Sequence, residues 1–554
     1  MGCNLQSAGA SSARISSAAR LRNLIRQAPP RAPANLRSGV TSPASLPLGA
    51  RFCSSRGALV CAAVSAAEAA QGKAPLQPES TIAIETLQAG TSAVDLGAVE
   101  TDLLAVGVYE GMIEKDDSGA LKNAELAALD ELLGGAVSEI LADDDFKAGK
   151  GSSVFLRVGQ KARIFGLVGL GAEDKATAVV DWGISAWQAA GGAIASAAKA
   201  NKAKTAAIAV LGESALPDAA VQKLSLGLLL GAYESTRFKN KPKPSPLEAV
   251  QILGSSASIE EAKAMAAGTM LTRYLVEAPP NVATPTHLAE AAALIASTFP
   301  EVMKLEVLEK EDCEKLGMGC FLGVAEASAE PPKFIHLTYT PPSGEVKRKL
   351  GVVGKGLTFD SGGYNIKAGP GSMIEMMKFD MGGSGATLGA AMATAGLKPE
   401  GVEVHFIVAS CENMVDAKGL RPGDILTASN GKTVEVNNTD AEGRLTLADA
   451  LLFAQNNCEV EAVVDIATLT GACMVALGPG IAGVMTPSEA MADIISGASK
   501  TAGEKVWRLP LEADYMDQLK SSVADMVNTG GRLGGTITAG LFLKEFIKEG
   551  VSWA

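Results

Sequence analysis

The chain has 554 residues, of which 47% are hydrophobic and 20% are charged, and its formal net charge is −12. This length predicts several domains, or one large and one small domain, and the apolar content is ample for a substantial core. The acidic balance excludes a general affinity for nucleic acid or for anionic membrane surfaces.

The first 62 residues differ in composition from the rest of the chain. They hold eight arginines, no lysine and no acidic residue, and they are rich in Ser, Ala and Pro. This composition is typical of an organelle transit peptide, and residues 58–66 (ALVCAAVSA) resemble a chloroplast processing site. We therefore expect residues 1–62 to be a disordered transit peptide for the chloroplast stroma. A mitochondrial destination and a basic arm that binds nucleic acid are the alternatives.

Loss of this leader would change the charge and the cysteine content. It would remove eight of the 49 basic residues and none of the 61 acidic ones, which leaves a net charge of −20 and no affinity for nucleic acid. Five scattered cysteines would remain, with no C-x-x-C pair: Cys313, Cys320, Cys411, Cys458 and Cys473. This pattern indicates a reducing compartment and argues against a disulfide scaffold.

A linker at 63–79 leads into a region where strand-like and helix-like patterns alternate. The strand-like runs are 81–87, 103–109, 153–158, 163–170, 205–212 and 247–253, and the helix-like runs are 123–137, 176–200 and 218–235. Such alternation predicts an α/β layer structure. We expect a smaller N-terminal α/β domain at 80–255, which carries no cluster of chemically active residues.

A helical pattern at 259–278 predicts a connecting helix at 256–280, and 281–554 is predicted to form a larger C-terminal α/β domain. We expect this domain to have a mixed central sheet flanked by helices. Residues 466–488 carry no charge and are long enough to span a membrane. Their several glycines and the strand-like start at 463–469 instead predict a buried strand followed by a glycine-rich loop, with no membrane span.

Two carboxylates mark the turn after the strand-like stretch 432–436. Asp440 and Glu442 lie two residues apart in NTDAEGRL (438–445), and a helical pattern follows at 445–455. The two acids are therefore predicted on a strand-to-helix turn, where ligands commonly bind in α/β proteins. Hard divalent cations prefer clustered carboxylate oxygens, whereas a D-x-E pair by itself is more often a solvated loop.

A second group of charged residues favours the metal interpretation. Lys355 and Asp360 follow an apolar strand at 350–353, Lys367 comes next, and Asp380 precedes a helix rich in small residues. The chain has only three histidines, and none has a familiar metal-binding spacing: His287, His336 and His405. We therefore expect a metal site built from carboxylates, with a lysine as a possible further ligand.

A phosphate-binding loop and a serine nucleophile are two other kinds of site that the motifs resemble. GVVGKG (351–356) lacks the earlier glycine and the Ser or Thr after Lys that a phosphate-binding loop requires. DSGG (360–363) has the look of a serine nucleophile, but no histidine lies near it in sequence to act as a base. Both patterns rank well below a metal centre.

The motifs VGKGLTFDSGG (353–363), NTDAEGRL (438–445) and ATLTGA (467–472) resemble the signatures of the leucyl aminopeptidase family. YNIKAGPG (364–371) most resembles the plant-type, chloroplastic branch, and the resemblance covers about residues 80–554. It implies a dinuclear metalloaminopeptidase that cleaves the N-terminal peptide bond and prefers Leu and other apolar first residues. Two divalent metals, Mn²⁺, Zn²⁺ or Mg²⁺, would act through a bridging hydroxide.

The resemblance also implies roles for individual residues. Asp360 and Glu442 would bridge both metals, Asp440 would complete one site, and Asp380 and Lys355 would complete the other. From the residues alone, an ordinary ion pair of Lys355 with Asp360 or Asp380 is the preferred interpretation.

Three further roles follow from the same resemblance. Lys367 would stabilise the oxyanion, and Arg444 would hold a bicarbonate ion that serves as the base. A buried ion pair of Arg444 with Asp440 or Glu442 is the alternative. Thr468 and Leu469 would dock the substrate, or would simply pack at the strand end.

The family is hexameric, so a homohexamer acting on peptides with a free N-terminus is expected. Family members continue beyond VSWA (551–554) for about one strand and a terminal helix. We therefore expect a truncated C-terminus, with an exposed edge strand and lower stability than a full-length relative. A metal-dependent phosphoester hydrolase and a chaperone-like oligomer are the alternative functions.

Overall fold

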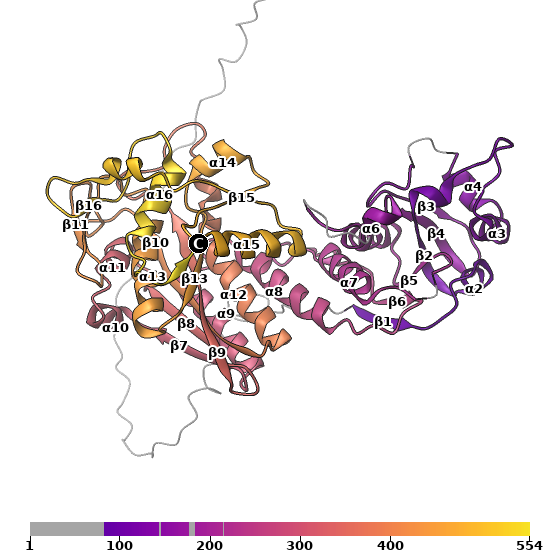
Figure 1. The fold of residues 1–554 in the computed structure, drawn as a ribbon, viewed down its shortest axis with the longest axis horizontal. Helices are drawn as coiled ribbons and strands as arrows, with labels where there is room; N and C mark the ends of the chain where they lie inside the picture. The colour runs from indigo at the N-terminus through magenta and orange to yellow at the C-terminus, as the bar shows by residue number, and fades with distance from the viewer. Residues whose placement is uncertain (1–81, 143–145, 177–182, 214) are drawn as a thin grey trace, which may run out of the picture. The chain divides into compact units, whose positions relative to one another are not determined.

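The computed structural model describes residues 82–142, 146–176, 183–213 and 215–554, and its main features are two six-stranded sheets with helices on both faces (Figure 1). The predicted leader and linker, residues 1–62 and 63–79, lie outside the described residues. Two α/β regions, the second with a mixed sheet, match the predicted fold class.

The C-terminal sheet has the strand order β17-β13-β9-β10-β8-β7. Its strands are β7 (Met303–Leu308), β8 (Lys333–Tyr339), β9 (Val346–Asp360), β10 (Gly401–Asn413), β13 (Ala462–Ile466) and β17 (Ser552–Trp553). The four strands from β17 to β10 are parallel, and β8 and β7 are antiparallel to their neighbours. The sheet is therefore mixed, and β9 and β10 lie at its centre.

Alternating residues of β10 face two different helix layers. Val404, Phe406 and Val408 pack against α8 (Glu260–Glu277), α9 (Pro285–Thr298) and α12 (Gly382–Leu397). Ile407 and Ala409 pack instead against α11 (Gly319–Ala325), α13 (Gly443–Asn457) and α16 (Gly535–Lys544). This period of two, with apolar residues on both faces, is what a central strand buried between two helix layers requires.

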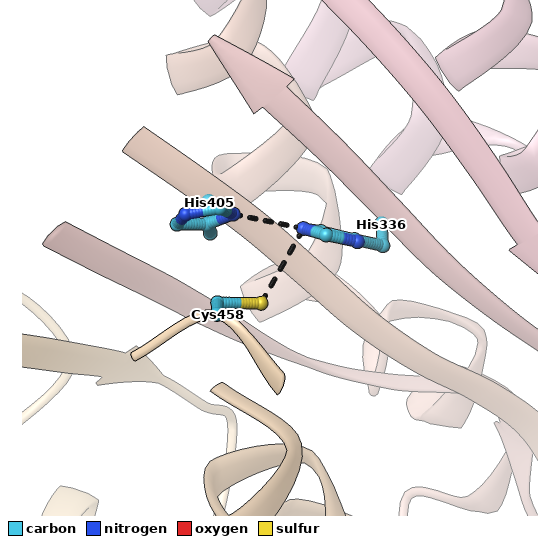
Figure 2. Close-up of side chains that lie close together, drawn as sticks. All are labelled: His336, His405 and Cys458. Carbon is cyan, nitrogen blue, oxygen red and sulfur yellow. Dashed lines mark hydrogen bonds between the residues drawn. The ribbon is translucent and has the colours of Figure 1, made fainter. Parts of the chain in front are cut away.

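Two histidines lie on the sheet face that α13 covers. His336 on β8 and His405 on β10 come together there, with Cys458 just beyond the end of α13 (Figure 2). This group lies far along the strands from the residues of the predicted metal site.

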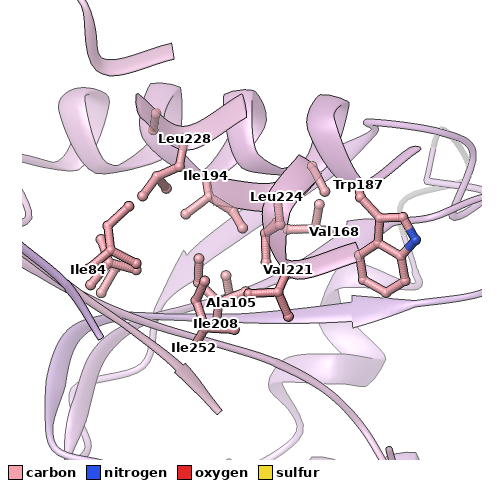
Figure 3. Close-up of a cluster of buried hydrophobic side chains, with 14 of the residues drawn as sticks. Ile84, Ala105, Val168, Trp187, Ile194, Ile208, Val221, Leu224, Leu228 and Ile252 are labelled. Carbon is pink, nitrogen blue, oxygen red and sulfur yellow. The ribbon is translucent and has the colours of Figure 1, made fainter. Parts of the chain in front are cut away.

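The N-terminal sheet has the strand order β1-β6-β5-β2-β4-β3, and β3 is its only antiparallel strand. Its strands are β1 (Ala83–Leu87), β2 (Thr101–Val108), β3 (Ser153–Arg157), β4 (Ala162–Gly169), β5 (Thr205–Val210) and β6 (Ala249–Leu253). One face packs on α6 (Ala186–Asn201), α7 (Asp218–Ala232) and the start of α8. Figure 3 shows this core, where Ile208 and Ile252 of the sheet meet Val221 and Leu224 of α7. The other face packs on α2 (Ala93–Ala98), α3 (Ala124–Leu132) and α4 (Ala136–Ile140).

A close helix crossing fixes where α12 begins. A Cβ atom on Gly268 of α8 would lie 2.3 Å from the Gly389 carbonyl oxygen, and one on Gly389 would lie 2.1 Å from Thr272 Oγ1. Thr272 Oγ1 also donates a hydrogen bond of 2.9 Å to the Gly385 carbonyl oxygen. Only glycine allows this approach, which packs α12 tightly against α8.

The remaining elements are short, except for α15 with its 14 residues. They are η1 (Glu110–Ile113), α5 (Glu173–Ala176), α10 (Lys310–Lys315), η2 (Ile374–Phe379), β11 (Ile425–Thr427), β12 (Thr433–Glu435), α14 (Gly471–Leu477), β14 (Ala482–Val484), α15 (Glu489–Ala502), β15 (Val506–Arg508), η3 (Ala513–Leu519) and β16 (Met526–Val527). Within the described part of the chain, none of the helices combines the length and hydropathy that crossing a bilayer requires.

Three local expectations were wrong. The helix expected at 123–137 is divided into α3 and α4, because Gly134 and Gly135 adopt φ values of +68° and +90°. The strand expected at 350–353 is β9, which runs on through Lys355 to Asp360, so these two residues lie within the strand rather than after it. The loop expected after β13 contains the short helix α14.

Candidate metal centre

The predicted site residues gather where β9 and β10 end. Asp360 is the last residue of β9 and pairs in register with Asn413, the last residue of β10. Asp380 follows η2 and precedes α12, and Glu442 caps the N-terminus of α13. Two helix starts and two strand ends therefore converge at the carboxyl edge of the parallel strands, where α/β folds bind ligands.

Lys355 lies at the centre of this group. Its side chain is 3% exposed, and its Nζ lies 2.7 Å from Asp380 Oδ2 and 2.9 Å from Glu442 Oε1. Nζ also donates a hydrogen bond of 3.2 Å to the Thr468 carbonyl oxygen. Burial opposes the charge on Lys355, but Asp380, Glu442 and Asp360 outweigh it and hold the pKa of the lysine above its ordinary value.

Lys367 makes a second set of ion pairs. Its Nζ lies 2.9 Å from Asp360 Oδ2 and also contacts Asp440 Oδ1. The Lys367 side chain is 16% exposed and that of Asp440 is 33% exposed, so this is the open side of the group. Burial works against the charge of Lys367, yet Asp360 and Asp440 together raise its pKa.

Three carboxylates lie close enough to share a cation. One oxygen each from Asp360, Asp380 and Glu442 lie within 4.8 Å of one another, and all three residues are buried. With Asp440, four acidic side chains face two lysines, and Glu442 Oε2 has no hydrogen-bond partner among the described residues. These buried carboxylate oxygens carry excess negative charge, and one of them is unpaired. Such a set of oxygen donors suits hard divalent cations.

The pKa values of two carboxyls reflect this crowding. Burial raises the pKa of Glu442 to about 8, and the nearby Asp360 and Asp380 reinforce the effect while Lys355 opposes it. Burial likewise raises the pKa of Asp380 to about 6, again against Lys355. Both acids are therefore held in an environment that disfavours their negative charge unless further positive charge is present.

Arg444 is buried at the second position of α13. Only 4% of it is exposed, and its Nε and Nη1 have no hydrogen-bond partner among the described residues. Among the described residues, no ion pair joins Arg444 to Asp440 or Glu442. The alternative of a buried ion pair is therefore not supported. Burial lowers the pKa of Arg444 to about 10, which leaves a cationic side chain with free donors.

Thr468 and Leu469 follow β13 at the rim of the group. Thr468 is exposed, and its Oγ1 donates a hydrogen bond of 2.9 Å to Asp380 Oδ1. Leu469 is partly buried and packs against the apolar core beneath α13. Thr468 is therefore part of the charged group, whereas the Leu469 side chain belongs to its support.

The supporting residues were not recognised from the sequence. Asn413 Nδ2 donates to Asp360 Oδ1 at 2.8 Å and to the Thr439 carbonyl oxygen at 3.0 Å. Thr439 Oγ1 donates to the Gly362 carbonyl oxygen at 2.7 Å and accepts from the Asn365 backbone N–H at 2.8 Å. These bonds fix the two acid-bearing loops to each other. The available signal was Asn413 at the end of an apolar strand and Thr439 within NTDAEGRL.

Comparison with known proteins identifies the family. The catalytic-domain model of the cytosol aminopeptidase family matches residues 270–554, and the N-terminal-domain model of the same family matches residues 105–242. Leucine aminopeptidase 2, chloroplastic, from Oryza sativa subsp. japonica is 50% identical over 502 residues, which cover 88% of this chain and 83% of that protein. Leucine aminopeptidase 1 from Arabidopsis thaliana is 49% identical over 489 residues, 86% of this chain and 92% of that protein.

A solved structure agrees with these sequences. A mutant of tomato leucine aminopeptidase matches with a TM-score of 0.77 and 45% sequence identity, and the match covers 85% of this chain and 90% of that one. The cluster of carboxylates from Asp360, Asp380 and Glu442 fits a dinuclear metallopeptidase. The chain therefore belongs to the cytosol aminopeptidase family, the metallopeptidases that include the leucine aminopeptidases.

Proposed function

We propose that the protein removes the first residue from peptides with a free N-terminus, preferring leucine and other apolar first residues. The observation that carries this proposal is the buried group of Asp360, Asp380 and Glu442. The negative charge of these three acids exceeds the positive charge of the two lysines beside them. Bound cations would balance this excess charge, and within this family a cation pair serves peptide hydrolysis.

The roles of the individual ligands are proposed from the resemblance to the family. Asp360 and Glu442 are proposed to contact both metals, Asp440 to complete one site, and Asp380 and Lys355 to complete the other. When bound by these residues, two divalent cations would polarise the scissile carbonyl and lower the pKa of a water molecule. Mn²⁺, Zn²⁺ and Mg²⁺ all accept carboxylate oxygens, and a nitrogen ligand favours Zn²⁺ over Mg²⁺ and Mn²⁺.

Lys355 must act as a neutral amine to bind a metal. Its Nζ lies between Asp380 and Glu442, at 2.7 Å and 2.9 Å, so a cation bound by those acids would occupy its immediate surroundings. A neighbouring cation lowers the pKa of an amine and takes over the role of the lysine proton in balancing the carboxylates. The ion pair is thus the protonated counterpart of the proposed ligand arrangement.

Lys367 and Arg444 are proposed to act on the substrate without binding metal. Lys367, on the open side of the group, would remain charged and donate to the oxygen that gains negative charge during hydrolysis. Arg444 would hold a bicarbonate ion through its unpaired Nε and Nη1, and that ion would take up the water proton. These unpaired donors on a buried guanidinium leave hydrogen-bonding capacity for an anion.

Thr468 and Leu469 are proposed to orient the substrate. Thr468 is exposed beside Asp380, and its carbonyl oxygen already accepts a hydrogen bond from Lys355. The backbone at these two residues would pair with the extended peptide while the free amine enters the charged group. An apolar side chain at the first position then avoids placing further charge there.

Location and assembly are inferred from the relatives and the leader. Several relatives, including those from Oryza sativa and Solanum tuberosum, are named as chloroplastic, and the arginine-rich segment 1–62 is proposed to direct this chain to the chloroplast stroma. A homohexamer is proposed from the resemblance to the family, and sedimentation velocity of the protein without the leader would test it.

The deciding experiment uses the metal-stripped protein, resupplied separately with Mn²⁺, Zn²⁺ or Mg²⁺. We expect hydrolysis of leucine p-nitroanilide to return with at least one metal, and N-acetyl-leucine p-nitroanilide to remain intact because it lacks the free amine. Release of phosphate from a phosphomonoester, without release of the anilide, would instead favour a phosphoester hydrolase. Protection of a heated client protein by an inactive Lys367→Ala variant would reveal a chaperone role independent of hydrolysis.

A further inference from the structure

A second group of metal-binding side chains lies outside the carboxylate centre. His336 Nε2 lies 2.9 Å from His405 Nδ1 and 3.6 Å from Cys458 Sγ, and the three donor atoms lie within 4.8 Å of one another (Figure 2). His405 aligns with Gly351 across the β9–β10 ladder, nine residues before Asp360. At about 3.3 Å per residue, this places the group about 30 Å along the strands from the carboxylate centre.

Each imidazole has a carboxylate behind it. His405 presents Nδ1 to the group, and its Nε2 lies 3.2 Å from Glu403 Oε1. His336 presents Nε2 to the group, and its Nδ1 lies 3.5 Å from Glu306 Oε2. The contact with Glu403 favours the His405 tautomer whose Nδ1 has a free lone pair, a second-shell arrangement typical of metal-bound histidine, whereas His336 Nδ1 makes no hydrogen bond among the described residues.

The distances are close to those of a tetrahedral zinc site. With Zn–N bonds near 2.05 Å and a Zn–S bond near 2.3 Å, two ligand nitrogens lie about 3.3 Å apart and a nitrogen and a sulfur about 3.6 Å apart. The sulfur–nitrogen distance here is 3.6 Å, and the nitrogen–nitrogen distance of 2.9 Å needs to open by only a few tenths of an ångström. Small rotations of the two rings would achieve this.

The surroundings provide a further oxygen. The Thr338 hydroxyl oxygen lies 3.2 Å from His336 Nε2 and 3.5 Å from His405 Nδ1, where it can bind a water in the fourth position. The His336 side chain is 11% exposed, so the group is not completely enclosed.

We propose that His336, His405 and Cys458 bind one zinc-like cation, separate from the metals of the carboxylate centre. On binding, the Cys458 thiol loses its proton to solvent, one sulfur–metal bond forms, and the two neutral imidazoles each donate a lone pair. The nitrogen and sulfur donors select Zn²⁺ over Mg²⁺ and Mn²⁺, which prefer oxygen. The ion links β8, β10 and the end of α13, the helix whose start carries Glu442 and Arg444.

Co²⁺ titration of the full-length, metal-stripped protein tests this site. Thiolate bound to Co²⁺ produces a strong near-ultraviolet charge-transfer absorption, and the proposed ligands of the carboxylate centre contain no sulfur. We expect this absorption to reach the intensity of one thiolate-bound Co²⁺ per chain, to disappear when Zn²⁺ is added, and to persist when Mg²⁺ is added. The readout is independent of peptide hydrolysis, so it stands or fails separately from the proposed function.

Variants identify the ligands. Cys458→Ser should abolish the absorption while leaving hydrolysis of leucine p-nitroanilide unchanged, and Cys473→Ser, at the least buried of the described cysteines, should leave it intact. Glu403→Gln keeps all three ligands and should weaken Co²⁺ binding by about 10–100-fold, the usual effect of losing a second-shell carboxylate. Absence of the absorption in the wild type, or its survival in Cys458→Ser, would show that the group is only a hydrogen-bonded cluster.

Discussion

At the scale of single residues, the carboxylate centre is governed by charge balance. Four acids and two lysines occupy a largely buried space, and Arg444 adds a cation whose Nε and Nη1 have no partner among the described residues. Buried polar atoms without partners are rare, so each one indicates a ligand or a water that belongs there. The unpaired oxygen of Glu442 therefore indicates a bound cation, and the unpaired nitrogens of Arg444 indicate a bound anion.

Replacement of Arg444 tests the anion role. Arg444→Ala should lower kcat by about 10²–10⁴-fold, the range expected for loss of a general base, while the metal content stays unchanged. Activity of the wild type should rise with added bicarbonate, and activity of Arg444→Ala should not respond. Arg421→Ala, at an arginine with a 70% exposed side chain, is the matched control and should behave as the wild type. A bicarbonate response that persists in Arg444→Ala would contradict the assignment.

Gly443 determines how closely α13 approaches Lys355. A Cβ atom at this position would lie 2.2 Å from Lys355 Cε and 2.6 Å from its Nζ. Gly443→Ala should therefore displace the lysine, and an ångström-scale displacement in a catalytic group can lower kcat about 100-fold. Steady-state kinetics and metal content of the purified variant provide the measurement. In Gly111→Ala, where a Cβ meets nothing within 4 Å, both should remain normal. Wild-type kinetics in Gly443→Ala would mean that the position of Lys355 is unimportant.

At the scale of helices and strands, most of the architecture was predictable because its periodicities are local. The runs at 205–212, 218–235 and 259–278 correspond to β5, α7 and α8 within a few residues. The length of β9 was not predictable, since Lys355 interrupts the apolar pattern and is tolerated only because acids from two other segments surround it.

Some residues of the candidate sites could be predicted from the sequence, and others could not. Its acids stand in short motifs and could be selected from the sequence. The grouping of His336, His405 and Cys458 could not, because it arises from the β8–β10 register and from the end of a helix far along the chain. Asn413 was missed for the same reason, since its role depends on lying beside Asp360 in the neighbouring strand.

Asp465 on strand β13 provides a test of how the stability of the fold depends on pH. Burial raises the pKa of Asp465 to about 6, although its Oδ2 accepts a 2.6 Å hydrogen bond from Trp553 Nε1 on β17. Because the folded-state pKa exceeds the unfolded value, the contribution of this group to stability is full below about pH 4 and is lost as pH rises through 6. Asp465→Asn cannot ionise and keeps an acceptor for the indole N–H.

Urea unfolding of wild type and Asp465→Asn at several pH values measures this effect. The variant should match the wild type near pH 4 and exceed it by about 1–3 kcal/mol at pH 8, as the shift of about two pKa units implies for a partly shielded group. Asp517→Asn, at a side chain that is 75% exposed, should show no such change with pH. If the difference between wild type and Asp465→Asn does not vary with pH, the buried carboxylate carries no penalty.

At the scale of the whole molecule, α13 connects the two metal-binding groups. Its first turn carries Arg444, with Glu442 as its N-cap, and Cys458 follows its last residue, while buried leucines between them anchor the helix to the sheet. Cations at either end would therefore stabilise the same folded unit. A cation that binds the folded chain and not the unfolded one raises the free energy of unfolding by mass action.

Metal removal should therefore lower the stability of the whole protein. With free Mn²⁺ at 100 times its Kd, each occupied carboxylate site should add about 2.7 kcal/mol to the free energy of unfolding. Urea unfolding of the chelator-treated protein across a series of Mn²⁺ concentrations measures this dependence. Asp360→Asn should lose most of the response because it removes a proposed shared ligand, whereas Cys458→Ser should keep it because Mn²⁺ prefers oxygen donors. A stability that is independent of Mn²⁺ in the wild type would mean that the carboxylate centre folds without cations, and the excess negative charge within it would then need another source of compensation.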